Sequence, residues 1–461
     1  MKKLMKTQSA RFVAVLVAAA LAVVLVTGAG HLPFLRADVT PQQVMTMDPV
    51  AIEAVKALDK DVTIYNLATD DGKDMWVDEL VQKYDRMSSH ISYEVINPAS
   101  EKATDLGVTA AENSLVVVSG DRSIVIPAEN LYENVYNEMY YYYYGELLAE
   151  QQSFVADQEL VNALQYVTDD SLPVMYALNG HGETAVTGMM MSQLETSRIV
   201  LKTLSMVDAG VPEDASAVLI SAPTADLTSA EADALLDYLE QGGDLVLLTG
   251  YMLEDLPNLE RVMAYYGMAA VKGVVLDKTS GYSYSAEYPQ YLMPDMAEHA
   301  ITGELAEAGI KATMPMAGAI ERSSVVRAGL TVEPLMTTSE TAYLKTNLMA
   351  TTIDQEEDDQ TGSYTLAMAA SEEETQIVWY MSGNFLSDSD ISISGGYNLF
   401  VLEGMLEWMM EVSSRIDIAD ENLMTTTLTL PQTGAMTAYI MLFVPALVML
   451  VVGLLSKRRK A

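Results

Sequence analysis

The residues best suited to chemistry are His181 and Glu183, in the segment Asn179-Gly180-His181-Gly182-Glu183. An imidazole beside a carboxylate can serve as a general base, and the flanking glycines allow the backbone to turn tightly. The apolar run PVMYAL comes directly before this segment. We therefore predict that the segment ends a strand and leads into a helix, which is where α/β folds place their ligand crevices.

Three interpretations of this segment are open. In the first, the glycines shape a strand-to-helix corner, His181 hydrogen-bonds across the loop mouth, and Glu183 favours the N-terminus of the next helix. In the second, Asn179 to Glu183 bind a ligand. In the third, His181 is a general base, which requires a nucleophile and oxyanion donors. The nearest serine candidate, Ser221, does not follow a strand-to-helix elbow, so we predict no catalytic residue and no enzymatic activity.

Several kinds of chemistry are excluded by what the sequence lacks. With no cysteine there is no disulfide, thiolate nucleophile or Cys-ligated metal. No Gly-x-x-x-x-Gly-Lys-[Ser/Thr], Gly-x-Ser-x-Gly or His-Glu-x-x-His motif occurs, and there are only four histidines. The acidic run DQEEDDQTG, residues 354–362, lacks the spacing of a known calcium loop and is expected to be a solvent loop. We predict no cofactor and no metal.

The acidic residues are confined to the middle of the chain, between Asp38 and Glu421. Eight cations lie in the two terminal tails. Removing them from the 26 Lys and Arg leaves 18 against 64 Asp and Glu, so the rest carries a net charge of −46. Such a body repels nucleic acid and anionic lipid headgroups, and nucleic acid is excluded as a partner.

Each end of the chain contains an apolar stretch long enough to cross a bilayer, residues 12–34 and 435–455. A basic tail lies between each apolar stretch and the nearer end of the chain, at residues 1–11 and 456–461. The positive-inside rule then predicts a two-pass protein of the cell membrane, with both termini cytoplasmic and the acidic body extracytoplasmic. A cleaved signal peptide, with small residues at Thr27 to Gly30, is the alternative for the first stretch.

The acidic body is predicted to contain two α/β domains. Residues 40–150 are predicted to form a helix, a strand, a helix and three further strands, which is a thioredoxin-like pattern without the Cys-x-x-Cys motif. Asp48-Pro49 is expected to begin the first helix, and Gly120-Asp121 to form a hairpin turn. Residues 155–420 read as buried strands alternating with helices, a flavodoxin-like or glutamine-amidotransferase-like parallel sheet. This domain includes a helix over about 190–201 and a capping box at Thr228-Ser-Ala-Glu231. The tyrosine run 140–144, near the end of the first domain, must expose some rings or place them at an interface.

The order of several segments resembles a known family. They are ALDKDVTIYNLAT, QKYDRMSSHISYEVINP, VMYALNGHGE, SAVLISAPTADLTSAEADALLDYLEQGGDLVLLTG, EHAIT, EPLMTTS and YNLFVLEGMLEWM, between two membrane segments. In sequence and order they are similar to GldG-like auxiliary components of ABC transport systems, of which the gliding-motility protein is the best-known type. The resemblance runs from Asp48 to the C-terminal membrane segment.

What the resemblance implies is a non-ATPase subunit that works with a separate ABC permease and ABC ATPase. Its extracytoplasmic domain has no defined substrate, and it provides no catalytic residue to carry over. The alternative function is an extracytoplasmic module that binds a solute or glycan. A hydrolase using His181 and Glu183 is the third.

Overall fold

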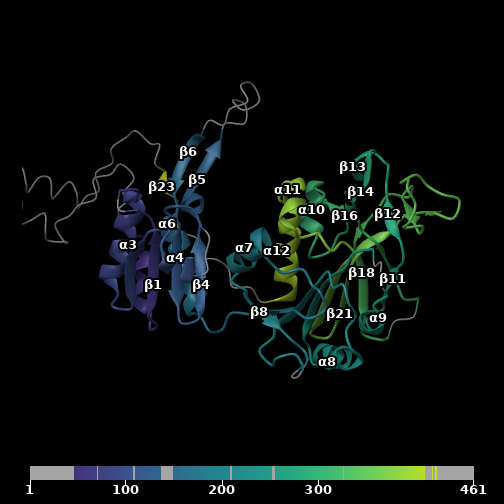
Figure 1. Cartoon of the computed structure of the whole chain (residues 1–461), viewed down its shortest axis with the longest axis horizontal. Coiled ribbons are helices and arrows are strands. Elements are labelled where there is room, and N and C mark those ends of the chain that lie inside the picture. Colours follow the sequence, from purple (N-terminus) through teal and green to yellow (C-terminus); the bar gives the residue numbers. More distant parts are fainter. Residues whose placement is uncertain are drawn as a thin grey trace, which may run out of the picture. The chain divides into compact units, whose positions relative to one another are not determined.

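The structure is a computed structural model of the whole chain (Figure 1). It describes residues 46–69, 71–106, 110–136, 149–207, 210–251, 255–324, 327–410, 418 and 421–422. The chain divides into two compact units: unit 1 comprises Met1–Thr168 and Ile416–Ala461, and unit 2 comprises Asp169–Arg415. Both are mixed α/β structures whose main sheets contain parallel strands.

Unit 1 is built on a four-stranded sheet in the order β2-β1-β3-β4. Strand β1 is parallel to β2 and antiparallel to β3, and β3 forms an antiparallel hairpin with β4. The strands are β1 (Val62–Leu67), β2 (Ile91–Ile96), β3 (Leu115–Ser119) and β4 (Arg122–Ile126), and a second sheet contains β5 (Tyr132–Tyr136), β6 (Ala149–Phe154) and β23 (Glu421–Asn422). The helices are α2 (Pro49–Ala57), α3 (Met75–Met87), α4 (Glu101–Asp105), the short 3-10 helix η2 (Ala128–Leu131) and α6 (Ala156–Thr168).

Local sequence signals explain where these elements begin. Asp48 caps α2 by accepting a hydrogen bond from the N–H of Val50, and Pro49 is its first residue, as predicted. The predicted hairpin is also confirmed, since Gly120 (φ +60°) lies in the left-handed region that its turn requires.

Helix α6 lies in unit 1, although the sequence analysis begins the second domain at residue 155. Eight of its thirteen residues are buried, among them Leu160, Val161 and Leu164. The helix packs against β3 and β4, and the side chain of Arg122 on β4 donates to the carbonyl of Tyr166. The apolar face of α6 therefore completes the first core.

Unit 2 is built on a ten-stranded sheet whose main path runs β11-β17-β21-β22-β10-β9-β7-β8, with β18 and β15 branching from β21. The strands from β22 to β8 are mutually parallel. They are β7 (Val174–Leu178), β8 (Val200–Leu204), β9 (Ala217–Ser221), β10 (Asp244–Leu248) and β22 (Thr375–Tyr380). The antiparallel strands are β11 (Met268–Val271), β15 (Asp295–Met296), β17 (Ala319–Arg322), β18 (Thr331–Thr337) and β21 (Thr365–Glu372).

Helices cover both faces of this sheet (Figure 1). Every residue of β9 and β10 is buried, and successive side chains alternate between two hydrophobic clusters. One cluster contains residues of α7 (Gly188–Thr196) and α12 (Tyr397–Met409), and the other contains residues of α8 (Ser229–Glu240) and α9 (Pro257–Tyr265). Continuous apolar strands in a doubly covered parallel sheet are what the sequence predicts for this region.

The helix expected over about 190–201 is wrong at both ends. Helix α7 begins at Gly188 and ends at Thr196, and residues 200–204 form the edge strand β8, which pairs in parallel with β7. Arg198 (φ +58°) has a left-handed backbone that breaks the helix. Val200 and Leu201 fit the predicted helix by their apolar character, but pairing with β7 makes them part of a strand.

Residues 274–361 contribute two small antiparallel sheets that were not predicted from the sequence. One sheet contains β12 (Val274–Leu276), β19 (Tyr343–Lys345) and β20 (Gln360–Thr361), and another contains β13 (Ser283–Ser285), β14 (Tyr288–Leu292) and β16 (Met314–Pro315). The remaining helices are α10 (Gly303–Ala308) and α11 (Asp388–Ile393).

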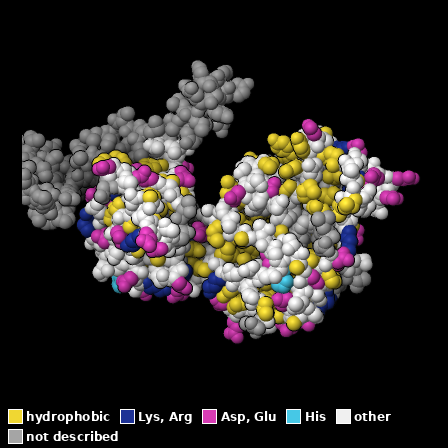
Figure 2. All heavy atoms as spheres, viewed as in Figure 1, with side chains coloured by type: hydrophobic (Ala, Val, Ile, Leu, Met, Phe, Trp, Pro, Cys, Tyr) yellow, Lys and Arg dark blue, Asp and Glu magenta, His cyan; other side chains and the backbone are white. Residues whose placement is uncertain are grey.

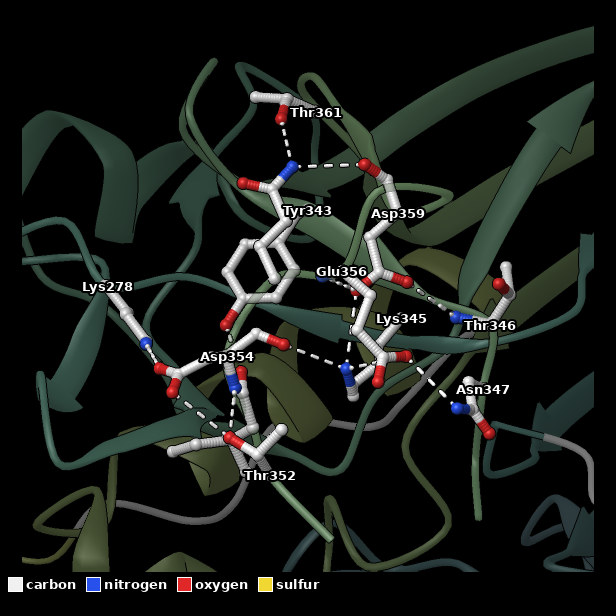
Figure 3. A network of polar contacts seen from close by, with 12 residues as sticks. Lys278, Tyr343, Lys345, Thr346, Asn347, Thr352, Asp354, Glu356, Asp359 and Thr361 are labelled. Carbon is white, nitrogen blue, oxygen red and sulfur yellow. Dashed lines mark hydrogen bonds and ion pairs between the residues drawn. The ribbon is translucent and has the colours of Figure 1, made fainter. Parts of the chain in front are cut away.

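The acidic run 354–362 is mostly exposed, as expected of a solvent loop, but it is anchored at a buried lysine. It folds around the ammonium of Lys345, which contacts the carbonyl of Asp354 at 2.9 Å, Glu356 at 3.3 Å and Asp359 at 3.4 Å (Figure 3). The side chains of Lys345 and Asp359 are 5% and 1% exposed. Burial alone would lower the pKa of Lys345, but the hydrogen bonds and charges of Glu356 and Asp359 raise it overall. A buried cation supplied by the chain thus organises this segment.

Among the described residues, no helix is long and apolar enough to span a bilayer. The predicted membrane segments, 12–34 and 435–455, lie outside the described residues, as do both basic tails and the tyrosine run 140–144.

Candidate functional site

The Gly-His-Gly-Glu segment follows β7 at the carboxyl end of the parallel sheet, as predicted. Gly180 (φ +139°) and Gly182 (φ +78°) both lie where side chains are disfavoured. A Cβ on Gly182 would lie 2.0 Å from Oγ1 of Thr224, so that position has no room for another residue. The carbonyl of His181 accepts hydrogen bonds from the N–H groups of Thr224 and Ala225, both at 2.9 Å, which join the turn to the loop after β9.

Glu183 folds back onto its own turn. Its Oε2 accepts from the N–H groups of Gly180 at 3.0 Å and His181 at 2.8 Å, and its Oε1 lies 3.1 Å from Nδ1 of His181. The expectation that Glu183 favours the next helix through its dipole is wrong, because α7 begins only at Gly188. The carboxylate at that N-terminus belongs to Asp388, which accepts from the N–H of Met189 at 2.7 Å.

The other ring nitrogen of His181 faces a second carboxylate. Nε2 lies 3.1 Å from Oε2 of Glu231, and Glu231 also completes the predicted capping box with Thr228 at the start of α8. Burial would raise the pKa of Glu231, but hydrogen bonds from the backbone and hydroxyl of Thr228 and from His181 lower it overall. Each ring nitrogen of His181 therefore faces a carboxylate oxygen, Nδ1 that of Glu183 and Nε2 that of Glu231.

This arrangement is a buried cluster of one imidazole ring and two carboxyl groups. The side chains of His181, Glu183 and Glu231 are 11%, 3% and 7% exposed. A general base needs a free nitrogen facing its substrate, and here both nitrogens face carboxylates. Ser221 is not a hydrogen-bond partner of either ring nitrogen; its carbonyl accepts from the N–H of Thr184 at 2.8 Å. This geometry therefore favours the interpretation in which the turn is structural over the one in which His181 is a general base.

The hollow part of the site lies beside this turn. A cavity of about 410 Å³ is lined by residues that directly follow β9, β10 and β22 and by the end of β16: Ala222, Pro223, Thr224, Thr249, Gly250, Tyr251, Leu256, Pro315, Met316, Gly383 and Asn384. A second cavity of about 290 Å³ shares Gly383 and Asn384 and extends along residues 184–187. A third, of about 280 Å³, shares Tyr251 and Met316 with the first and reaches the segment 347–353.

None of Asn179, Gly180, His181, Gly182 and Glu183 lines these three cavities. Their neighbours do: Thr184 lines the 290 Å³ cavity, and Thr224, which bonds to the carbonyl of His181, lines the 410 Å³ cavity. That the five residues bind a ligand stays a prediction. Sequence reasoning did not identify Tyr251, Met316 or Asn384, and no local motif marks them.

Within the ranges that the structure describes, no group of three or more His, Asp or Glu side chains is arranged to hold a metal ion. The carboxylates of Glu183 and Glu231 already contact the ring of His181, and the acidic segment 354–359 contacts the ammonium of Lys345. These carboxylates therefore already contact His181 or Lys345 of the same chain.

The fold and site define an α/β domain with a crevice at the carboxyl edge of its sheet and an inward-facing histidine. The family model described as ABC-type uncharacterized transport system matches residues 172–377. This match supports an auxiliary component of an ABC transport system, and a transport component is consistent with a non-enzymatic role. No curated protein matches this chain.

Among solved structures, the mmIFT52 N-terminal domain is similar at 12% identity and a TM-score of 0.39, covering 53% of this chain and 100% of that one. A ThuA-like protein from Parabacteroides merdae is similar at 10% identity and 0.32, covering 53% and 92%. The carbohydrate deacetylase Agd3 is similar at 11% identity and 0.27, covering 50% of this chain and 32% of that one. Similarity at this level carries no argument about function.

Proposed function

We propose that this protein is a GldG-like, non-ATPase auxiliary subunit of an ABC-type transport system, anchored in the cell membrane by residues 12–34 and 435–455. Its two α/β units are extracytoplasmic, both termini are cytoplasmic, and its partners are a separate permease and ATPase. The match of residues 172–377 to the transport-system family is the observation that carries this proposal. Both ring nitrogens of His181 lie within hydrogen-bond distance of the carboxylates of Glu183 and Glu231, which supports a role without catalysis.

We also propose finer relationships for the two units. The order β2-β1-β3-β4, with β1 parallel to β2 and a terminal hairpin, supports a thioredoxin-like first unit that acts as a scaffold. The order β8-β7-β9-β10-β22, all parallel, supports a flavodoxin-like or amidotransferase-like second unit. Without a cysteine, neither has the thiol chemistry associated with such folds.

The transport partnership is tested by purifying a tagged full-length chain from membranes in mild detergent and identifying what accompanies it. We expect an ABC permease and an ABC ATPase in constant ratio to the chain. A matched control replaces residues 435–455 with a leucine helix of the same length, which keeps the protein in the membrane but changes any helix-to-helix contacts. Recovery of the native chain without either partner would count decisively against the proposal.

The absence of cysteine allows a direct test of topology. Met349 is 91% exposed, so Met349→Cys introduces one reactive thiol on the surface of unit 2. Ser456→Cys places the single thiol in the C-terminal tail. A membrane-impermeant maleimide should label the Met349→Cys protein in intact cells, and the Ser456→Cys protein only after permeabilisation. The opposite pattern would reverse the predicted orientation.

A further inference from the structure

The 410 Å³ and 280 Å³ cavities of unit 2 form two adjoining chambers, separated by the shared side chains of Tyr251 and Met316. The 410 Å³ cavity is here the first chamber and the 280 Å³ cavity the second. The first chamber opens at the carboxyl ends of three neighbouring parallel strands, which is the position where α/β sheets bind ligands. Its volume lies within the range of about 300–1,000 Å³ that is usual for small-molecule sites. The position and the size therefore agree with a binding site.

The backbone around the first chamber is held in an unfavourable conformation. Ala222 (φ +49°) and Met316 (φ +50°) are two of the five non-glycine residues with a left-handed backbone in the described part of the chain, and both line this chamber. Such strain concentrates at functional sites, because the surrounding structure must maintain it. A Cβ on Gly250 would meet nothing within 4 Å, whereas a Cβ on Gly383 would lie 3.0 Å from that of Ala222.

The charges around the chambers argue for an uncharged ligand. Among the residues that the structure describes, no Asp, Glu, Lys, Arg or His lines the first chamber. Lys345 lines the second, but its ammonium is already bound by Glu356 and Asp359 (Figure 3). A charged ligand would lose its hydration without gaining a counter-ion, which is costly.

The polar groups specify what else the ligand must carry. Gln290 lines the second chamber, and its Oε1 is shielded from solvent and has no hydrogen-bond donor among the described residues. A buried acceptor without a donor costs free energy, and rotation of the Gln290 amide toward the chamber would let an N–H or O–H of a ligand satisfy it. The rest of the lining is mainly apolar, and Met316, Leu348 and Ile353 are 38%, 36% and 42% exposed at its rim. Figure 2 shows hydrophobic side chains gathered on this part of unit 2, around β13, β14 and β16.

We propose that the two chambers bind a small uncharged molecule with an apolar body and at least one N–H or O–H donor, the donor pairing with Oε1 of Gln290. Tyr251 and Met316 contact the apolar body from between the chambers. The inference is independent of the transport partnership, because binding is a property of this chain alone. Loss of the permease or ATPase would leave it intact.

The test uses the full-length chain in lipid nanodiscs free of detergent and three matched probes. N-acetyl-leucinamide is uncharged, N-acetyl-leucine is its anionic counterpart, and leucinamide is its cationic counterpart. Titration followed by saturation-transfer NMR should show that the uncharged probe binds at least about tenfold more tightly than either charged one. No binding by N-acetyl-leucinamide, or equal binding of all three, would overturn the proposal.

Two variants locate the binding. A Cβ at Gly250 would meet nothing within 4 Å, so Gly250→Leu extends a side chain from the lining of the first chamber. Gly303→Leu, where a Cβ is equally unobstructed, lies outside the chambers and is the matched control. Gly250→Leu should weaken binding by about tenfold, while Gly303→Leu should not. Gln290→Met should weaken binding without lowering the melting temperature, because it removes an acceptor that has no donor in the free protein. Unchanged affinity in both Gly250→Leu and Gln290→Met would place the binding elsewhere.

Discussion

Replacing His181 with alanine tests whether the Gly-His-Gly-Glu turn is structural. The change removes the imidazole ring between Glu183 and Glu231 and leaves two carboxylates that are 3% and 7% exposed. Breaking a buried ion pair by removing one partner costs about 3–5 kcal/mol. Both carboxylates keep backbone donors, from Gly180 and residue 181 for Glu183 and from Thr228 for Glu231. We therefore expect a loss at the lower end, about 3 kcal/mol in the free energy of unfolding of unit 2.

The assay is urea unfolding at neutral pH, with hydrogen exchange of residues 180–184 and 225–231 reporting on the turn itself. Glu231→Gln is the matched control, because glutamine can still accept from the N–H of Thr228 but carries no charge. It should cost less than His181→Ala. A His181→Ala protein within about 0.5 kcal/mol of the natural one would refute the structural interpretation.

The same cluster predicts a dependence on acid. The pKa of Glu231 lies below its ordinary value of 4.5, so the folded state prefers the ionised carboxylate. Its contribution to stability is present above pH 4.5 and is lost as the pH falls through the lowered pKa. His181→Ala removes one cause of that lowering. The variant should therefore lose less stability between neutral pH and acid than the natural chain does.

Two other predictions concern buried charges elsewhere in unit 2. Burial raises the pKa of Asp244 to about 8 against the opposing hydrogen bond from the N–H of Gln376, so the stability it contributes is full below pH 3.8 and is lost as the pH rises to about 8. Asp244→Asn should raise the melting temperature at pH 8 more than at pH 5, and an equal effect at both would contradict this. Lys345→Met leaves Asp359 buried without its cation and should make residues 346–361 sensitive to protease. Lys278→Met, at a side chain that is 40% exposed, should not, and equal sensitivity of the two variants would argue against a special role for Lys345.

Much of the fold is predictable because its signals are local. The Asp48 cap, the Gly120 turn and the Thr228–Glu231 capping box each lie within a few residues, and all three are confirmed. The buried parallel strands are also predictable, because a strand covered on both faces must be apolar throughout. Strand β8 is not predictable in this way, since its residues also suit a helix and only pairing with β7 decides between the two.

The same distinction between local signals and contacts of distant segments applies to the candidate site. By itself the sequence determined that the glycine-flanked turn follows a strand, that thiol and P-loop chemistry are absent, and that the acidic residues lie between two apolar ends. Only the tertiary structure decided that His181 meets Glu231, fifty residues away, and that Lys345 organises the acidic run. The chambers around Tyr251 and Met316 likewise come from segments far apart in the chain. The physical reason is that caps, turns and apolar runs depend on neighbouring residues, whereas ion pairs and cavities depend on how the sheet brings distant loops to one edge.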